Sequence, residues 1–64
     1  MYTIYSKPSC GYCLQAKDLL EMEQLPFEYK QLGTHYSLDE LMTLAPDAKS
    51  FPQIFKDGVL VGGY

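Results

Sequence analysis

The apolar and polar positions in the first half of the chain predict a strand, a helix and a second strand. Tyr2–Tyr5 is β-branched or aromatic, which suits a short strand buried on both faces. A helical period then runs from Gly11 to Leu25, where Pro26 ends it. The expected core positions of this helix are Ala16, Leu19 and Leu20. Phe27–Lys30 alternates apolar and charged residues, as in a strand with one face in water.

The second half of the chain predicts a helix followed by a β-hairpin. Ser37–Glu40 matches a capping box, which marks a helix N-terminus, and Pro46 ends this helix. Its expected apolar side consists of Leu38, Leu41, Met42 and Ala45. Two short apolar runs, Phe51–Phe55 and Val59–Val61, flank Lys56–Gly58, and an Asp-Gly turn between such runs is typical of a hairpin.

The resulting order, β-α-β-α-β-β, predicts one α/β domain over residues 1–64, with helices packed on a mixed sheet. The last strand leads directly into Gly62–Tyr64, which leaves one face of the sheet short of cover. We therefore expect that a third helix should follow and that this chain is a C-terminally truncated form.

The charge of the chain excludes some classes of partner. The net charge is -3, with five Lys and no Arg, so no basic stripe is available for nucleic acid. No apolar stretch approaches the roughly 20 residues that cross a bilayer, and Met1 leads almost directly into a strand, which leaves no room for a signal peptide. We expect a soluble, monomeric protein of the reducing cytoplasm, where a Cys pair indicates redox or metal chemistry rather than a permanent crosslink.

The chemistry of the chain is expected at Cys10 and Cys13, where the first strand passes into the first helix. A disulfide over so short a loop stabilises little, so the pair is interpreted as functional. The helix N-terminus and nearby Lys7 favour a thiolate and should lower the pKa of Cys10, whereas Cys13 lies toward the apolar side of the helix. The alternatives are half of a zinc site, with distant His35 as a further ligand, or a pair without a role.

Three motifs occur together: Lys7–Cys13, Phe51–Phe55 and Gly62–Gly63. In this combination and order the whole chain resembles a glutaredoxin of the dithiol type, most similar in length to small phage and bacterial members. The resemblance implies the thioredoxin fold, with Cys10 as the nucleophile, Cys13 as the resolving thiol and no metal ligand. It also implies a cis peptide bond before Pro52 and a glutathione site made of Lys7, Tyr12, Lys49, Phe51, Pro52, Gly62 and Gly63.

The function implied by the resemblance is glutathione-dependent reduction of protein disulfides or glutathione mixed disulfides, with ribonucleotide reductase as a candidate client. The chain departs from the family at Gly11, where proline is usual, and family members without that proline include carriers of a [2Fe–2S] cluster. Phe51 is bulkier than the usual valine, Lys49 stands where Arg is common, and the residues that hold the γ-glutamyl end are missing after Tyr64. A thioredoxin-like donor reduced by a flavin reductase and an inactive fragment are further alternatives.

Overall fold

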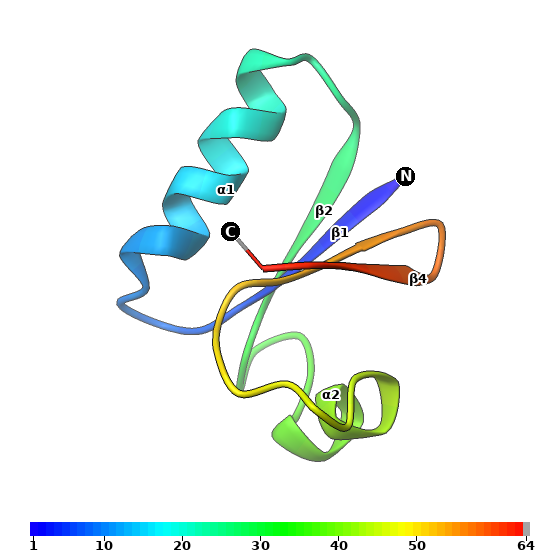
Figure 1. The fold of residues 1–64 in the computed structure, drawn as a ribbon. Coiled ribbons are helices and arrows are strands. Elements are labelled where there is room, and N and C mark those ends of the chain that lie inside the picture. The colour runs from blue at the N-terminus through cyan, green and yellow to red at the C-terminus, as the bar shows by residue number, and fades with distance from the viewer. Residues whose placement is uncertain (64) are drawn as a thin grey trace.

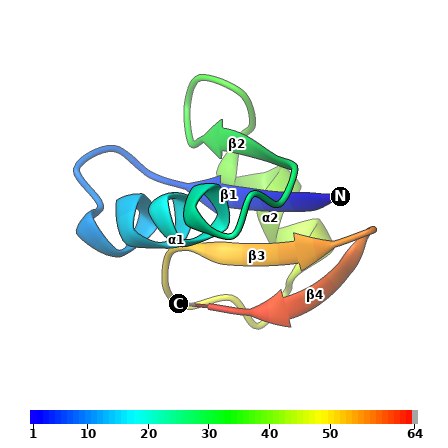
Figure 2. The same cartoon turned by 90° about the horizontal axis from the view of Figure 1, so that it is seen from above.

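Strand β1 (Tyr2–Ser6) lies inside a four-stranded sheet in the computed structural model, which describes residues 1–63. The strands follow the order β2-β1-β3-β4, side by side in Figure 2. Strand β2 (Phe27–Gln31) is parallel to β1 and β3 (Gln53–Lys56) is antiparallel to it, while β4 (Val59–Gly62) is antiparallel to β3. The order of elements and the mixed sheet confirm the sequence prediction.

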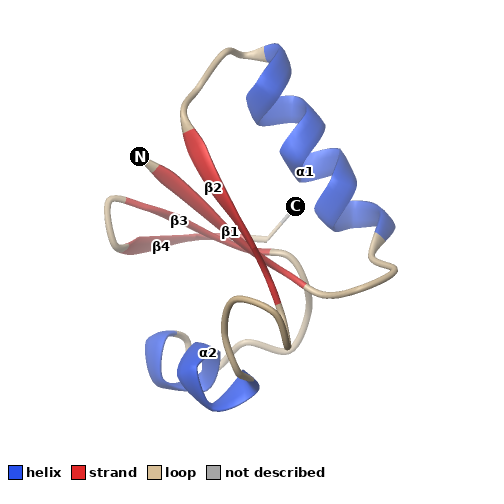
Figure 3. Ribbon diagram, turned by 180° about the vertical axis from the view of Figure 1, so that it is seen from behind, coloured by secondary structure: helices blue, strands red, loops and turns tan. Residues whose placement is uncertain are grey.

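Helices α1 (Gly11–Met22) and α2 (Leu38–Leu44) lie on opposite faces of this sheet (Figures 1 and 3). Because side chains alternate along a strand, the sheet contributes to two core clusters. Within residues 1–63, the buried members of the cluster under α1 are Ile4, Ala16 and Leu20. The buried members of the cluster under α2 are Tyr36, Leu41, Ala45 and Phe55.

Some positions expected in the core are exposed. On α1, Leu19 is 46% exposed, and on α2 both Leu38 and Met42 face solvent, so these three core assignments were wrong. In each helix the apolar stripe is wider than the strip that contacts the sheet. Leu20 and Leu41 are buried against the sheet together with Ala16 and Ala45, whereas the apolar residues at the edges of each stripe stay exposed.

Helix α1 ends at Met22, three residues before the predicted end at Leu25. Gln24 adopts a left-handed conformation with φ 57°, and its N–H donates to the carbonyl of Glu21. The Leu25 N–H donates to the carbonyl of Leu20, which completes a Schellman motif. The motif usually has glycine at the left-handed position, so the sequence did not predict it.

Two local predictions are confirmed in detail. Ser37 caps α2, since its hydroxyl accepts the Glu40 N–H and the Glu40 carboxylate accepts the Ser37 N–H. Asp57 and Gly58 have φ values of 51° and 84°, as a type I′ hairpin turn between β3 and β4 requires. Neither helix among residues 1–63 has the length and apolar character to cross a membrane.

Candidate functional site

The site is built around Cys10, which caps the N-terminus of α1. Its backbone is extended, and its Sγ accepts a hydrogen bond from the Cys13 N–H at 3.2 Å. The two cysteines form a disulfide with their Cα atoms 5.2 Å apart. No acidic side chain lies in the first turn of α1, so no carboxylate of this turn opposes the effect of the N–H groups and the helix dipole on the sulfur.

The two cysteines differ in accessibility. Cys13 is 0% exposed because it points into the protein on the same side of α1 as Ala16, whereas Cys10 is 9% exposed. Cys10 is therefore the sulfur that a substrate can approach, although the disulfide form exposes little of it. Since disulfide sulfurs do not titrate, the lowered pKa of the Cys10 thiol stays a prediction.

Lys7 and Phe51, both predicted for the glutathione site, lie together. The Lys7 Nζ is 5.6 Å from the centroid of the Phe51 ring, a cation–π contact at an exposed lysine. The pairing of β1 with β3 causes this meeting, because Tyr5 lies opposite Gln53 in the antiparallel register. Two residues beyond Tyr5 is Lys7, and two residues before Gln53 is Phe51.

The peptide bond between Phe51 and Pro52 is cis, as the family resemblance implied. Pro52 is fully buried, and Gly63 lies so close that a Cβ added there would be 3.3 Å from the Pro52 carbonyl oxygen. Gly62 has a φ of 127°, which side-chain-bearing residues rarely adopt. The three predicted positions after Phe51 thus meet at one end of β3 and β4.

The remaining predicted residues are placed less specifically. Tyr12 is 63% exposed on the first turn of α1, directly before Cys13. Lys49 is exposed in the segment between α2 and β3, two residues before Phe51. His35, weighed as a zinc ligand, instead accepts the Gln31 N–H at its Nδ1, at 3.0 Å.

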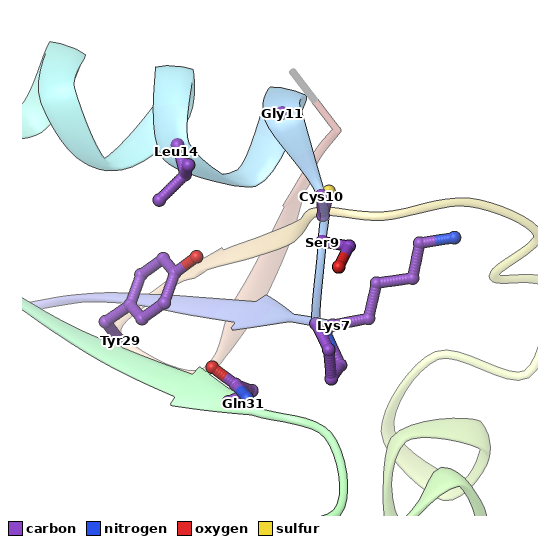
Figure 4. A pocket seen from close by; sticks show the side chains of 8 residues that line it. Lys7, Ser9, Cys10, Gly11, Leu14, Tyr29 and Gln31 are labelled. Carbon is purple, nitrogen blue, oxygen red and sulfur yellow. The ribbon is translucent and has the colours of Figure 1, made fainter.

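Sequence reasoning missed a cavity of about 200 Å³ that adjoins Cys10. Its lining residues come from the β1–α1 loop, α1 and β2: Lys7, Pro8, Ser9, Cys10, Gly11, Leu14, Tyr29 and Gln31. In Figure 4, Leu14 and Tyr29 point toward each other across it, and the Lys7 side chain points away from Tyr29 and Gln31. The parallel register, with Ser6 opposite Gln31, brings the end of β2 beside this loop.

The start of the site loop is fixed by Tyr36, a buried residue that the sequence did not single out. Its hydroxyl donates to the Ser6 carbonyl at 2.6 Å, and the same carbonyl accepts the Leu32 N–H at 2.8 Å. Burial, with smaller contributions from the charges of Tyr5 and Tyr29, raises the pKa of Tyr36 to about 12. The Tyr36 phenol is therefore a neutral donor at physiological pH, and it holds the end of β1 where Lys7 begins.

Metal ligands are not grouped in this region. Within residues 1–63, no set of three or more His, Cys, Asp or Glu side chains is placed to hold a metal ion. Cys10 and Cys13 are bonded to each other.

A cysteine pair that closes to a disulfide at a helix N-terminus, on a mixed sheet with a cis proline, defines the class: a small α/β dithiol–disulfide protein. A family model described as glutaredoxin matches residues 2–61. The chain belongs to the glutaredoxin family.

Individual relatives agree with this assignment. Glutaredoxin 1 of Salmonella typhimurium is 34% identical, over 98% of this chain and 82% of that protein. Glutaredoxin 1 of Rickettsia bellii is 33% identical, over 94% of this chain and 65% of its own length. The chain thus spans slightly less than two thirds of this rickettsial relative.

The fold is also shared with a solved structure. The crystal structure of glutaredoxin 1 from Francisella tularensis, complexed with cacodylate, superposes with a TM-score of 0.77 at 23% identity. The match covers 97% of this chain and 80% of that one. It confirms the thioredoxin fold expected from the sequence.

Proposed function

We propose that the chain is a glutathione-dependent thiol–disulfide oxidoreductase in which Cys10 is the nucleophile and Cys13 the resolving thiol. The observation that carries the proposal is the Cys10–Cys13 disulfide at the N-terminus of α1, with Cys10 the more accessible partner. A dithiol that can close to a disulfide carries two electrons, and an accessible sulfur at a helix N-terminus is suited to attack.

The first step is attack by the Cys10 thiolate on one sulfur of a substrate disulfide. A new bond forms between Cys10 Sγ and that sulfur, the substrate S–S bond breaks, and the other half leaves as a thiolate that is protonated by water. In the reduced chain the Cys13 N–H can continue to donate to Cys10 Sγ, and a hydrogen bond to an ionised acceptor is stronger than one to a neutral acceptor. The same contact therefore favours the attacking form.

The mixed disulfide on Cys10 can be resolved in two ways. The Cys13 thiolate attacks Cys10 Sγ, which releases the bound half and leaves the Cys10–Cys13 disulfide. Two glutathione molecules then restore the dithiol and become glutathione disulfide. When glutathione itself is the half bound to Cys10, a second glutathione attacks that glutathione sulfur, so Cys13 is not needed.

Glutathione is proposed to lie on the β3 side of Cys10. Support comes from the close approach of Gly63 to the Pro52 carbonyl, where a side chain at position 63 would crowd the backbone, and from the Lys7 cation held over Phe51. Tyr12, Lys49 and Gly62 complete the proposed site, with the two exposed lysines available to the carboxylates of the tripeptide. Protein disulfides, including that of ribonucleotide reductase, are the proposed clients, and the cytoplasm is the proposed location because glutathione keeps it reducing.

The proposal is tested by steady-state turnover of the mixed disulfide between glutathione and 2-mercaptoethanol, coupled to glutathione reductase. The wild-type chain is compared with Cys10→Ser and Cys13→Ser. We expect Cys10→Ser to abolish turnover, and Cys13→Ser to keep it while losing the reduction of a protein disulfide such as that of insulin.

A thermal melt of each chain shows that it is folded under the assay conditions. A folded wild-type chain without glutathione-coupled turnover contradicts the proposal. If the same chain is reduced by a flavin-dependent disulfide reductase instead, the thioredoxin-like alternative replaces it. Equal loss of both activities in Cys13→Ser contradicts the assignment of Cys13 as a resolving thiol alone.

A further inference from the structure

We propose that the cavity on the β2 side of Cys10 binds an apolar side chain that flanks the reacting cysteine of a protein substrate. The inference rests on the proposed function and adds a substrate preference to it. The cavity of about 200 Å³ reaches Cys10 at one end and lies between α1 and β2. Its size is comparable to one leucine or phenylalanine side chain.

The chemistry of the lining favours an apolar occupant. Leu14, Pro8 and the ring of Tyr29 supply apolar surface, and none of the lining residues in the described part of the chain is Asp or Glu. Leu14 is 56% exposed on the first turns of α1, and it belongs to neither core cluster. Covering such a side chain with another apolar group removes both from water, which is favourable. Ser9 and Gln31 add a few polar groups to the lining, as is usual in binding pockets.

The cavity is separate from the region proposed for glutathione. Register places the two regions on opposite sides of β1, since Tyr5 is paired with Gln53 of β3 and Ser6 is paired with Gln31 of β2. Cys10 follows β1 in the chain, and the cavity reaches it from the β2 side. Lys7 both lines the cavity and contacts Phe51, so it lies between the two regions.

The reaction itself selects a protein as the occupant. After attack on a protein disulfide, the client's cysteine is bonded to Cys10 Sγ. The residues before and after that cysteine are then held near Cys10, because consecutive residues of an extended chain are only roughly 3.3 Å apart along the chain. A flanking side chain can then enter the adjacent cavity. Glutathione has no large apolar side chain beside its cysteine, and it gains nothing from this surface. The cavity therefore favours protein substrates with an apolar residue beside the reacting cysteine, and it leaves the reaction with glutathione unchanged.

The test uses two otherwise identical peptides, with Leu-Cys-Leu or Ser-Cys-Ser at the centre, each joined through its cysteine to 2-nitro-5-thiobenzoate. The aromatic thiol has the lower pKa and leaves, so the peptide becomes bonded to Cys10, and the released thiolate is followed by its colour. Single-turnover rates of the pre-reduced chain are divided by the rates with glutathione alone, which removes the intrinsic reactivity of each peptide.

For the wild-type chain we expect the leucine peptide to react about fivefold faster, as partial burial of one leucine side chain would give. Leu14→Gln should bring the ratio of the two rates to about one, and Leu14→Met should restore it. Leu19→Gln is the matched control, because Leu19 is also an exposed leucine of α1 but does not line the cavity.

Equal rates for the two peptides with the wild-type chain overturn the inference. So does a preference that survives Leu14→Gln, since the apolar contact would then lie elsewhere on the surface. A preference that Leu19→Gln removes as fully as Leu14→Gln has the same consequence. Turnover of the glutathione mixed disulfide by the wild-type chain is measured in parallel, so that failure of the proposed function is distinguished from failure of the subsite.

Discussion

Tyr36→Phe tests how the end of β1 is held beside the site. The substitution removes one hydroxyl and leaves the ring, which packs edge-on against Tyr5 with the centroids 5.0 Å apart. The lost hydrogen bond is the one donated to the Ser6 carbonyl at 2.6 Å. That carbonyl keeps the N–H of Leu32 as a donor, so no buried group is left without a partner.

At neutral pH the variant should be less stable by about 1 kcal/mol, the usual net value of a hydrogen bond between neutral groups. In a domain of this size that corresponds to a melting temperature lower by about 4–8 °C. A larger loss, of about 3–5 kcal/mol, is expected only when an aromatic ring is deleted from a core.

At alkaline pH the difference should reverse. The pKa of Tyr36 is raised from 10.0 to about 12 in the folded chain, chiefly by burial, so the unfolded chain releases its phenolic proton first. The stability that Tyr36 contributes is complete below pH 10 and is lost between pH 10 and 12. By about pH 11 this loss reaches about 1.4 kcal/mol, which exceeds the hydrogen bond. Tyr36→Phe has no such proton and should then be the more stable chain.

The assay is urea unfolding of both oxidised chains, followed by far-ultraviolet circular dichroism from neutral pH to about pH 11. The two chains are otherwise identical, so the difference between the two unfolding free energies isolates Tyr36. A difference that stays constant across this range refutes the reasoning, because it would mean that Tyr36 is not buried as a neutral donor.

Three further substitutions test other parts of the structure. Ser37→Ala removes the cap of α2 and should lower the free energy of urea unfolding by about 1 kcal/mol, while Ser37→Thr should retain most of it. Gly63→Ala places a methyl group 3.3 Å from the Pro52 carbonyl, which should cost about 1 kcal/mol of stability and raise the KM for glutathione in the coupled assay. Lys7→Met should slow alkylation of the reactive thiol by iodoacetamide about two- to fivefold at neutral pH, and Lys56→Met, at the other end of the sheet, should not.

The elements that the sequence predicts well are those with strong local signals. Asp57 and Gly58 adopt the two positive φ values that an Asp-Gly turn requires, and Ser37 forms the capping box that its spacing indicates. The end of α1 had no such signal. Pro26 marks where a helix must have ended, but the chain leaves the helix earlier through Gln24, a residue with no particular preference for the left-handed conformation.

The candidate site divides in the same way. Cys10 and Cys13 are only three positions apart in the sequence, and the helix at whose start they lie is predicted from its own apolar pattern. Their chemistry could therefore be inferred directly from the sequence. Tyr29 and Gln31 come from a different strand, and nothing in β2 alone indicates that they line a cavity at Cys10. Their position depends on the register between β1 and β2. The alternation of apolar residues indicates which face of the sheet a side chain lies on, but not which residue of the neighbouring strand lies opposite it.

Register also explains why two separated segments lie on either side of the loop that leads from β1 to Cys10. Ser6 ends β1, and its carbonyl is held by both Leu32 and Tyr36, so the loop to Cys10 starts from a fixed point. From that point the antiparallel neighbour β3 brings the cis Phe51–Pro52 bond to one side, and the parallel neighbour β2 brings Gln31 to the other. A central strand with one parallel and one antiparallel neighbour therefore gives its C-terminal end two chemically different flanks. The β3 flank is the side proposed for glutathione, and the β2 flank carries the cavity proposed for a side chain of a protein substrate. Under these two proposals, the different neighbours of β1 allow one sulfur to react with two kinds of disulfide.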